Sequence, residues 1–518
     1  MVDPAAMPDQ PPPPGVAPAP ASLARRVARG AVWMVAIRFT SRTLGLVSTL
    51  VVARILVPAD FGLVAVATAF SQSVDAVSEV GLSEALVRHP HEAHGLYDTA
   101  FTLQAIRGCL TGAVVALAAP FAGPWLGEPR LTPILLVLAA LAVLGGFENV
   151  AVAEFRRNLR FGVELVLQIL PRLLMVATAI VAALLLRSYW ALLIAMAVAK
   201  LARVVATYAV HPHRPRLALG RWRDLAHFSF WTWATSLAGI AWSRSDAFIV
   251  TPALGAAAFG LYALAWEVGS LPVSELIAPV AGALFPGFAE ARRRGEAEAL
   301  APLAVVAFLT MLVAPLAIAI SAAAGPLVAV LLGPRWLAAR PLVAVIACIC
   351  AVAPFGWVSA TLLSASGRVA RYFVVVALSA AVRVVMLLHA VQAGGLLAVA
   401  WWSVASLGFE ALVFAVVLRA AGELRLRDGL GGLVRTFLAS AVALVAVRAS
   451  GWGWHAAPAH ATALAFAEGA AIGLYAIAVF AAAVLLLWRL AGAPDGPERR
   501  LAALLRPLLA RLGRQPAG

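Results

Sequence analysis

The sequence predicts an all-α protein that crosses a membrane many times, with about fourteen transmembrane helices. Of its 518 residues, 63% are hydrophobic and only 13% are charged, and the mean hydropathy is +0.92. Soluble globular proteins are about 45–50% apolar. The apolar runs are continuous and about 20 residues long, which suits spanning helices rather than barrel strands. We expect two six-helix lobes in a parallel repeat, followed by a C-terminal helix pair.

The predicted spans follow one another with short connections. Their approximate limits are 30–53, 61–83, 97–121, 131–153, 163–186, 188–210, 227–250, 258–282, 302–322, 341–366, 370–392, 395–418, 431–449 and 463–490. Arginine clusters recur in every second connection. Because positive loops stay on the cytoplasmic side, this alternation predicts a multi-pass protein with both termini in the cytoplasm. The almost exclusive use of Arg as the cation, with abundant Ala, Val and Gly, indicates a bacterial source, so we expect the bacterial inner membrane. The alternation also explains the net charge of +15, so nucleic acid is not an expected partner.

The spans and their connections divide the chain into parts. We predict a disordered Pro-rich cytoplasmic tail (1–22), an N-lobe (23–212), a cytoplasmic interfacial linker (213–226), a C-lobe (227–420), an additional helix pair (431–490) and a basic cytoplasmic tail (491–518). The linker and the basic tail mix leucines with arginines. They either lie on the cytoplasmic leaflet as amphipathic helices or are ordinary solvated segments.

An internal repeat supports the two lobes. Leu56–Ala67 reads LVPADFGLVAVA and Leu254–Ala265 reads LGAAAFGLYALA, so a shift of 198 residues superimposes the two FGL motifs. Six predicted spans separate the copies, and this even number gives both copies the same direction. Parallel repeats of this kind build several classes of transporter. Chance similarity between Ala- and Leu-rich spans is the alternative.

Ionisable side chains lie inside several predicted spans. Arg38 and Arg42 are four residues apart in the first span, so they share one helix face. Asp75 and Glu79 repeat this spacing in the second span. A buried Arg costs about 2.5–3.5 kcal/mol on membrane-insertion scales, so each needs a cavity or a partner. These faces either line a water-filled transport cavity or form ion pairs that hold helices together.

Several segments, taken in order, resemble one known family. They are GAVW, VVARILVPADFGLVAVA and EVGLSEALVR around the first two spans, FRRNLRF after the fourth, SRSDAFIVTPALGAAAFGLYALA across the seventh and eighth, and LVAVLLGPRWLAARP before the tenth. Over most of 23–420 the chain resembles the Wzx-type polysaccharide flippases of the multidrug/oligosaccharidyl-lipid/polysaccharide (MOP) exporter superfamily. The resemblance implies two lobes facing a central cavity and alternating access. It also implies an undecaprenyl-diphosphate-linked oligosaccharide as cargo, for the biosynthesis of a surface polysaccharide such as lipopolysaccharide or exopolysaccharide.

Arginines within the spans are the candidate contacts for that diphosphate, since a guanidinium forks onto phosphate oxygens with two hydrogen bonds. We expect four contacts, Arg42 foremost: Arg38, Arg42, Arg172 and Arg244. Further candidates for the cavity or for ion coupling are Asp75, Glu79, Asp246, Arg107 and Gln104. The acids either neutralise the arginines when cargo is absent, or one carries a proton or Na⁺ that couples transport to a gradient. Alternatively, Arg244 pairs locally with Asp246, and Arg383 pairs with Glu410.

Other functions fit the sequence less well. It contains no GxxxxGK[ST] pattern for ATP hydrolysis, and we expect no catalytic residue, metal or other cofactor. The predicted periplasmic loops are short, which disfavours a glycan polymerase or glycosyltransferase. A cation-coupled drug exporter of the same superfamily would need an acidic, aromatic cavity, whereas the arginines favour an anionic cargo. A flippase for a lipid-linked peptidoglycan precursor stays open. The expected partners are the lipid-linked oligosaccharide, membrane lipids, and polysaccharide polymerase or assembly proteins.

Overall fold

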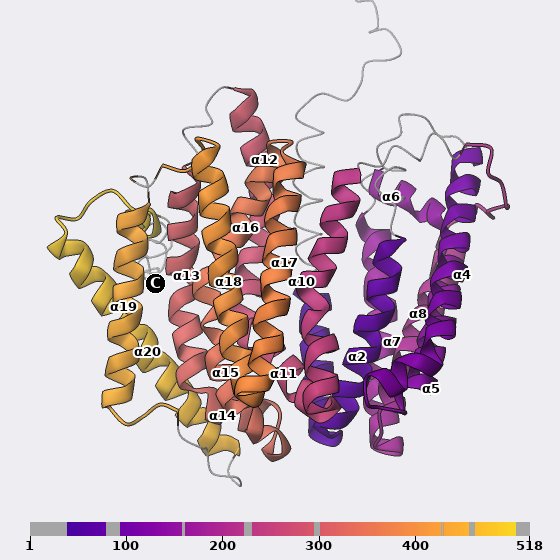
Figure 1. The fold of residues 1–518 in the computed structure, drawn as a ribbon, viewed down its shortest axis with the longest axis horizontal. Coiled ribbons are helices and arrows are strands. Elements are labelled where there is room, and N and C mark those ends of the chain that lie inside the picture. The colour runs from indigo at the N-terminus through magenta and orange to yellow at the C-terminus, as the bar shows by residue number, and fades with distance from the viewer. Residues whose placement is uncertain are drawn as a thin grey trace, which may run out of the picture.

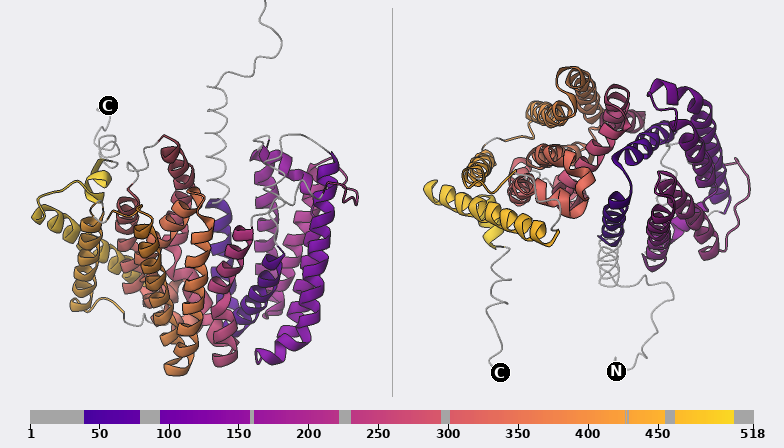
Figure 2. Two further views of the ribbon diagram at one scale, coloured as in Figure 1. Left: turned by 45° about the horizontal axis from the view of Figure 1, so that its top comes forward. Right: turned by 90° about the horizontal axis from the view of Figure 1, so that it is seen from below.

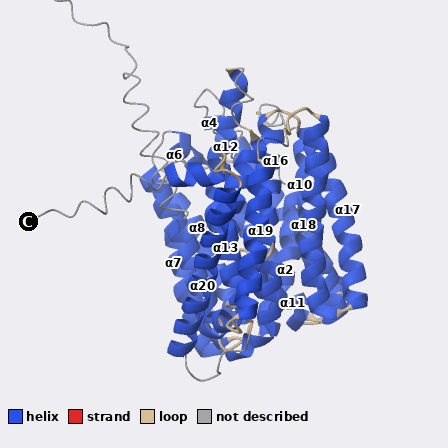
Figure 3. Ribbon diagram, turned by 90° about the vertical axis from the view of Figure 1, so that its left-hand side faces the viewer, coloured by secondary structure: helices blue, strands red, loops and turns tan. Residues whose placement is uncertain are grey.

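The computed structural model describes residues 39–78, 94–157, 161–221, 230–294, 301–425, 427, 429–454 and 462–503. The predicted tail 1–22 lies outside these residues. Every regular element in the described part of the chain is a helix (Figure 3), which confirms the predicted all-α class.

The helices of the first half form one group. They are a helix at 39–55, α2 (Pro58–Val77), α4 (His94–Trp125), α5 (Leu131–Gly146), α6 (Ala153–Arg157), α7 (Phe161–Leu186) and α8 (Trp190–Val210), with a short 3₁₀ turn, η1 (Val150–Val152). In this group α4 packs against α5, α7 packs against α8, and α2 contacts both α4 and α5. Helix 39–55 joins the group through Val52 and Leu56, which are buried with alanines of α7 and α8.

The helices of the second half form another group beside the first (Figure 1). They are α10 (Phe230–Leu254), α11 (Ala256–Gly269), η2 (Val273–Ile277), α12 (Ala278–Arg293), α13 (Pro302–Ala322), α14 (Ala324–Leu331), η3 (Pro334–Ala339), α15 (Arg340–Ala347), α16 (Ile349–Ala365), α17 (Val369–Ala393) and α18 (Gly395–Ala420). Here α10 packs on α17, α17 on α18, and α13 on α16. We call the two groups the first and the second group.

The last two helices flank the second group. Helices α19 (Leu430–Ala449) and α20 (Thr462–Leu490) pack against each other and against α13, and they lie at the edge of the molecule in Figure 2. Arg435 on α19 binds both carboxylate oxygens of Glu498, at 2.6 and 3.0 Å. Only 3% of the Glu498 side chain is exposed. This buried ion pair ties the segment that follows α20 back onto α19.

A helix lies at each of the fourteen predicted spans. Among the described residues, eight helices are individually long and apolar enough to cross a membrane. A ninth is formed by the bent pair Pro334–Ala347 and Ile349–Ala365 if the two pieces count as one span. Large apolar side chains cover the outer surface, including Leu117 (73% exposed) on α4 and Leu185 (77%) on α7. A bilayer solvates such a surface, whereas water does not.

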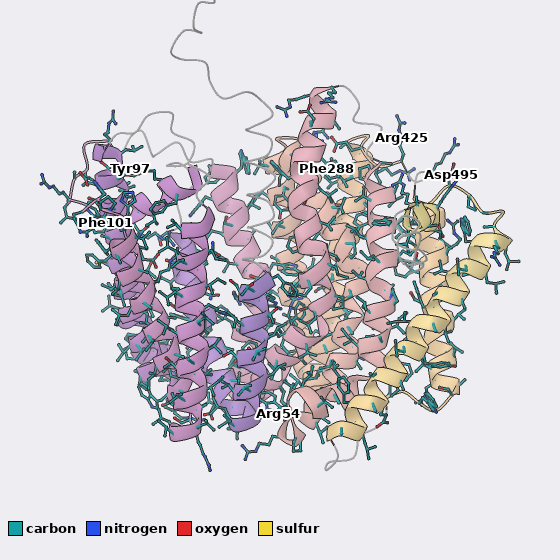
Figure 4. The ribbon with its side chains drawn as sticks, turned by 180° about the vertical axis from the view of Figure 1, so that it is seen from behind. Arg54, Tyr97, Phe101, Phe288, Arg425 and Asp495 are labelled. Atoms are coloured by element: carbon teal, nitrogen blue, oxygen red, sulfur yellow. The ribbon has the colours of Figure 1, made fainter. Side chains whose placement is uncertain are left out.

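The two ends of the molecule agree with the predicted topology. Arg54, from a predicted periplasmic connection, lies at one end in Figure 4. Arg425 and Asp495, from predicted cytoplasmic segments, and Tyr97, at the start of the predicted span 97–121, lie near the other end. We call the end with Arg54 the Arg54 end. The alternation of charged loops therefore corresponds to opposite ends of the helical bundle.

The repeated motif lies where the two groups meet. Helix α2 begins at Pro58 and α11 begins at Ala256, 198 residues later, and the two helices pack against each other. A Cβ atom on Gly62 would lie 1.8 Å from the carbonyl oxygen of Ala256, and one on Gly260 would lie 2.0 Å from that of Pro58. Only glycine permits such a close approach of two helices. Gly62 and Gly260 are equivalent positions of the repeat, and the helix crossing requires glycine at both.

Polar contacts close the same crossing at the Arg54 end. The Trp336 indole donates to the carbonyl of Ala53 at 2.7 Å, and its ring meets Phe61 edge-on at 5.4 Å. Arg335 donates to the carbonyl of Ile55 at 3.0 Å, and Arg54 donates to the carbonyl of Val330. Each of these contacts joins the first group to the second.

The connection between the groups runs along the first one. His213 Nε2 lies 3.1 Å from Asp98 Oδ1, and the backbone N–H of Ala218 donates to Thr102 Oγ1 at 2.8 Å. Both partners belong to α4. Residues 211–218 are thus fixed to the first group, while 222–226 of the predicted linker lie outside the described residues.

Candidate functional site

Two of the predicted site residues, Arg38 and Glu79, lie outside the described residues. The others fall into three places: the contact between the two groups, the interior of the second group, and a cavity within the first group.

Arg42 joins helix 39–55 to the second group. Its Nε lies 2.7 Å from Glu275 Oε1, its Nη2 donates to Ser274 Oγ at 3.3 Å, and its Nη1 lies 4.0 Å from Glu267 Oε1. Each of the three charged side chains keeps about a third of its surface exposed. The cation therefore has two carboxylate partners, both from the opposite group, and remains accessible.

Local winding aligns the two acids. Glu267 lies in α11 and Glu275 in η2, which is a π-helical turn. Eight residues along an ideal α-helix leave two side chains about 80° apart around the axis. A π turn absorbs one extra residue and brings the two positions nearly onto one face. Hydropathy carries no sign of this turn, but two acids within the predicted span 258–282 were a signal that our arginine-centred prediction missed.

Arg172 on α7 lies beside helix 39–55, the helix that carries Arg42. A Cβ atom on Gly45 would come within 2.0 Å of Arg172 Nη2, so the glycine makes room for the guanidinium. The buried Nε of Arg172 has no hydrogen-bond partner within the described part of the chain. Gly45 lies three residues after Arg42, about one helical turn. Two of the predicted diphosphate contacts thus lie near one another, and one of them has an unused donor.

Arg244 does not form the ion pair with Asp246 that the sequence left as an alternative. Its Nη2 donates instead to the side-chain oxygen of Gln72 on α2. Residues two apart on a helix point to different sides, so α10 presents Arg244 to the first group and Asp246 to its own. The contact between Arg244 and Gln72 is a further polar link between the groups, and its acceptor is a neutral amide.

Asp246 and Arg383 form an ion pair inside the second group, at 3.7 Å, whereas the alternative from the sequence paired Arg383 with Glu410. The Arg383 side chain is 1% exposed and donates to Ser406 Oγ at 2.8 Å. Its guanidinium also lies over the ring of Trp242, 4.9 Å from the centroid. Pairing with Glu410 was only an alternative, and the sequence does not show that α10 packs against α17. The Arg383 guanidinium is thus engaged inside the second group.

A cavity of about 390 Å³ lies inside the first group. Two ion pairs stand in its wall: Arg107 with Asp75 at 2.8 Å, and Lys200 with Glu148 at 2.9 Å. Gln104 donates to the carbonyls of Gly145 and Glu148 at the end of α5. The lining residues are Thr68, Ser71, Gln72, Asp75, Gln104, Arg107, Gly108, Leu138, Leu141, Ala142, Gly145, Gly146, Glu148, Met196 and Lys200.

The sequence indicated part of this cavity. It singled out Asp75, Arg107 and Gln104, which the structure brings together, but it missed Glu148 and Lys200. Both lie within predicted spans, and Lys200 is the sole lysine of the chain. An ionisable residue at membrane depth was the available signal.

These features define a class of protein. Two groups of membrane helices meet through a repeated glycine crossing, and charged side chains lie along their contact and within one of them, as in a two-lobed membrane transporter. Comparison with solved structures gives the same fold. An inward-facing multidrug MATE transporter of the MOP superfamily matches with a TM-score of 0.60 at 16% identity, over 76% of this chain and 98% of that one. The lipid II flippase MurJ, in an inward closed conformation, matches with a TM-score of 0.65 at 12% identity, over 88% and 99%.

The family follows from the sequence. Residues 51–341 match the family described as polysaccharide biosynthesis protein, and the chain belongs to it. The succinoglycan biosynthesis transport protein ExoT of Rhizobium meliloti is 29% identical over 331 residues, which cover 63% of this chain and 67% of ExoT. The lipopolysaccharide biosynthesis protein WzxC of Escherichia coli is 25% identical over 285 residues, 52% of this chain and 56% of WzxC. The resemblance to Wzx-type flippases is thereby confirmed.

Proposed function

We propose that this protein is a flippase that moves an undecaprenyl-diphosphate-linked oligosaccharide across the bacterial inner membrane for surface polysaccharide biosynthesis. Its family and the names of its relatives support a transport role in polysaccharide biosynthesis. We infer no catalytic role. Both termini are proposed to lie in the cytoplasm, in line with the alternating loop charges.

The observation that carries the proposal is the position of Arg42. It is an accessible cation at the contact between the groups, and its partners are carboxylates from the opposite group. A diphosphate offers the same geometry as a carboxylate with more charge, so it competes for the guanidinium fork. Arg172 adds a second cation with an unused donor. Arg244 adds a third, whose present acceptor is a neutral amide.

The glycine crossing supports alternating access. The two groups are joined at the Arg54 end by close backbone packing and by hydrogen bonds. Release of cargo at that end requires α2 and α11 to separate. We propose that this end faces the periplasm and that the described state is closed toward it.

A lipid-linked peptidoglycan precursor presents the same diphosphate, so the arginines alone do not distinguish it from a polysaccharide intermediate. Membership of the polysaccharide biosynthesis family favours the latter. A drug exporter that takes cations is less suited to a contact built on Arg42, Arg172 and Arg244.

The test is export by variants of Arg42 in a strain that depends on this protein. Removing a charge-assisted contact costs about 1.5–3 kcal/mol, so we expect Arg42→Ala to lose most surface polysaccharide at normal protein level. Arg42→Lys keeps the charge without the fork and should retain a part. Arg130→Ala, at an exposed arginine of the first group that pairs with Glu128, is the matched control. Full export by both Arg42 variants would refute the diphosphate contact.

A further inference from the structure

The cavity in the first group is not explained by the diphosphate contacts. Arg42, Arg172 and Arg244 are absent from its lining. At about 390 Å³ it falls within the range of small-molecule sites, roughly 300–1,000 Å³. Asp75 and Lys200 keep 49% and 36% of their side-chain surface exposed, so the space is open to entry.

Glycines of α4 and α5 make room for the residues that line the cavity. A Cβ atom on Gly145 would lie 2.4 Å from Cε and Nζ of Lys200, so a larger residue there would block the path of this side chain to Glu148. A Cβ atom on Gly108 would lie 2.7 Å from Cα of Gly146, and this close packing fixes α4 against α5. The charged wall thus depends on glycines at particular positions.

The repeat shows that one position of the cavity lining differs between the two groups. The shift of 198 residues places Trp266 of α11 at the position of Thr68 in α2. Thr68 lines the cavity. Trp266 instead packs in the second group, with its ring 5.6 Å from the Arg383 guanidinium and 5.9 Å from the Tyr262 ring. The second group thus has the bulky Trp266 at the position where the first group has the small Thr68.

The lining indicates the chemistry of an occupant. The lining holds two cations and two carboxylates, which are paired with one another at hydrogen-bonding distance. Arg203, which is outside the lining, also contacts Glu148 at 3.3 Å and donates to the carbonyl of Leu167. The charges of the lining are thus engaged within the protein rather than free for a diphosphate or a cation. The same groups, with two glutamines, Ser71 and Thr68, offer many donors and acceptors in fixed positions. Leu138, Leu141 and Met196 add an apolar surface. An uncharged sugar ring suits both surfaces of the lining, because its hydroxyl groups bond the polar side chains and its C–H face packs on the apolar ones.

We propose that this cavity is a sugar subsite that takes one or more hexopyranose units of the cargo. The proposal rests on the proposed function, because it assumes a glycan attached to a lipid diphosphate. Gln72 connects the two sites, since it lines the cavity and also accepts a hydrogen bond from Arg244 at the contact between the groups. The subsite therefore provides selectivity for the glycan, whereas the arginines bind the diphosphate that all such lipids share.

The test compares two ligands on the purified full chain: undecaprenyl diphosphate, and the undecaprenyl-diphosphate-linked oligosaccharide extracted from the host's own membranes. Ala142→Phe fills the cavity from α5. Ala140→Phe makes the same change two residues away at an exposed position of the same helix and is the matched control. Thr68→Trp fills the cavity from α2 with the residue that the repeat places in the second group.

We expect both filling variants to bind the glycan-bearing lipid about tenfold more weakly, as for the loss of one or two hydrogen bonds. Binding of undecaprenyl diphosphate should not change, and Ala140→Phe should match the parent with both ligands. Equal binding of the glycan-bearing lipid by filled and parent proteins would overturn the subsite, and so would an equal loss with both ligands. Arg42→Ala should weaken both ligands. If it weakens neither, the diphosphate contact fails independently of the subsite.

Discussion

Replacing Gly62 with alanine should favour the state in which the Arg54 end is open. The added Cβ would lie 1.8 Å from the carbonyl oxygen of Ala256 and 2.7 Å from its carbon. Both are backbone atoms of α11, so no side chain can rotate away. Ordinary contact begins at about 3.4 Å, and the crossing must therefore widen by about 1.6 Å, the difference between 3.4 and 1.8.

The magnitude follows from the cost of overpacking. Forcing extra atoms into a well-packed contact costs about 1–3 kcal/mol. When this cost falls on one of two states, it changes their ratio about 5- to 150-fold. Alanine is otherwise the better helix former by roughly 0.5–1 kcal/mol, so a general loss of helix stability is not the expected result.

The assay is the reaction of a cysteine at Ala53 with a membrane-impermeant maleimide, in a background without Cys109, Cys348 and Cys350. Ala53 is 0% exposed, and its carbonyl accepts the Trp336 hydrogen bond, so labelling reports opening at this crossing. We expect Gly62→Ala to raise the labelling rate at least about fivefold. Gly239→Ala is the control, because a Cβ atom there has no other atom within 4 Å.

The expected result has a symmetric counterpart. Gly260→Ala places its Cβ 2.0 Å from the carbonyl oxygen of Pro58, so it should raise the labelling rate in the same way. A rate for Gly62→Ala equal to that of Gly239→Ala would refute the argument that this glycine crossing holds the groups together.

Three further outcomes follow from buried polar contacts. Arg435→Ala leaves the Glu498 carboxylate buried without its partner, and we expect the free energy of unfolding to fall by about 3–5 kcal/mol. The measurement is the thermal unfolding temperature in detergent, which should recover when Glu498 is also replaced by Met. Arg383→Met should destabilise the protein by a similar amount and should be rescued by Asp246→Asn, whereas an unchanged unfolding temperature would count against a structural role for the pair. Trp336→Phe keeps a ring but loses the hydrogen bond to helix 39–55, and a modest rise in labelling at the crossing is expected from the loss of about 1 kcal/mol.

Hydropathy was sufficient to predict the class and the placement of the helices, because each helix must carry an apolar surface long enough for the bilayer. Local winding was not predictable in this way. The predicted span 258–282 corresponds to α11, the π turn η2 and part of α12. The predicted span 341–366 is broken at Cys348, near its start, where Pro334–Ala347 and Ile349–Ala365 meet at 48°. Such changes depend on tertiary packing, and an average over about 20 residues does not detect them.

The sequence identified charged residues within the spans but not their partners. Arg42, Arg107, Arg244 and Arg383 were all singled out, yet only their packing decides which acid or amide each one meets. The choice depends on the phase of each side chain around its helix and on which helices are neighbours. The repeat was informative because it related two segments, and those segments proved to be in contact at Gly62 and Gly260.

On the proposed function, the position of Arg42 links binding to movement. Its partners Glu267 and Glu275 belong to the opposite group, so one interaction serves both as an anion site and as a contact between the groups. A diphosphate that occupies the guanidinium displaces these carboxylates and removes the contact. A ligand shifts an equilibrium only by its differential affinity for the two states, and this exchange supplies such a difference. Glu275→Gln, which weakens the contact but keeps Arg42, should therefore bind undecaprenyl diphosphate more tightly than the parent. Weaker binding would show that the carboxylate assists the ligand rather than competing with it.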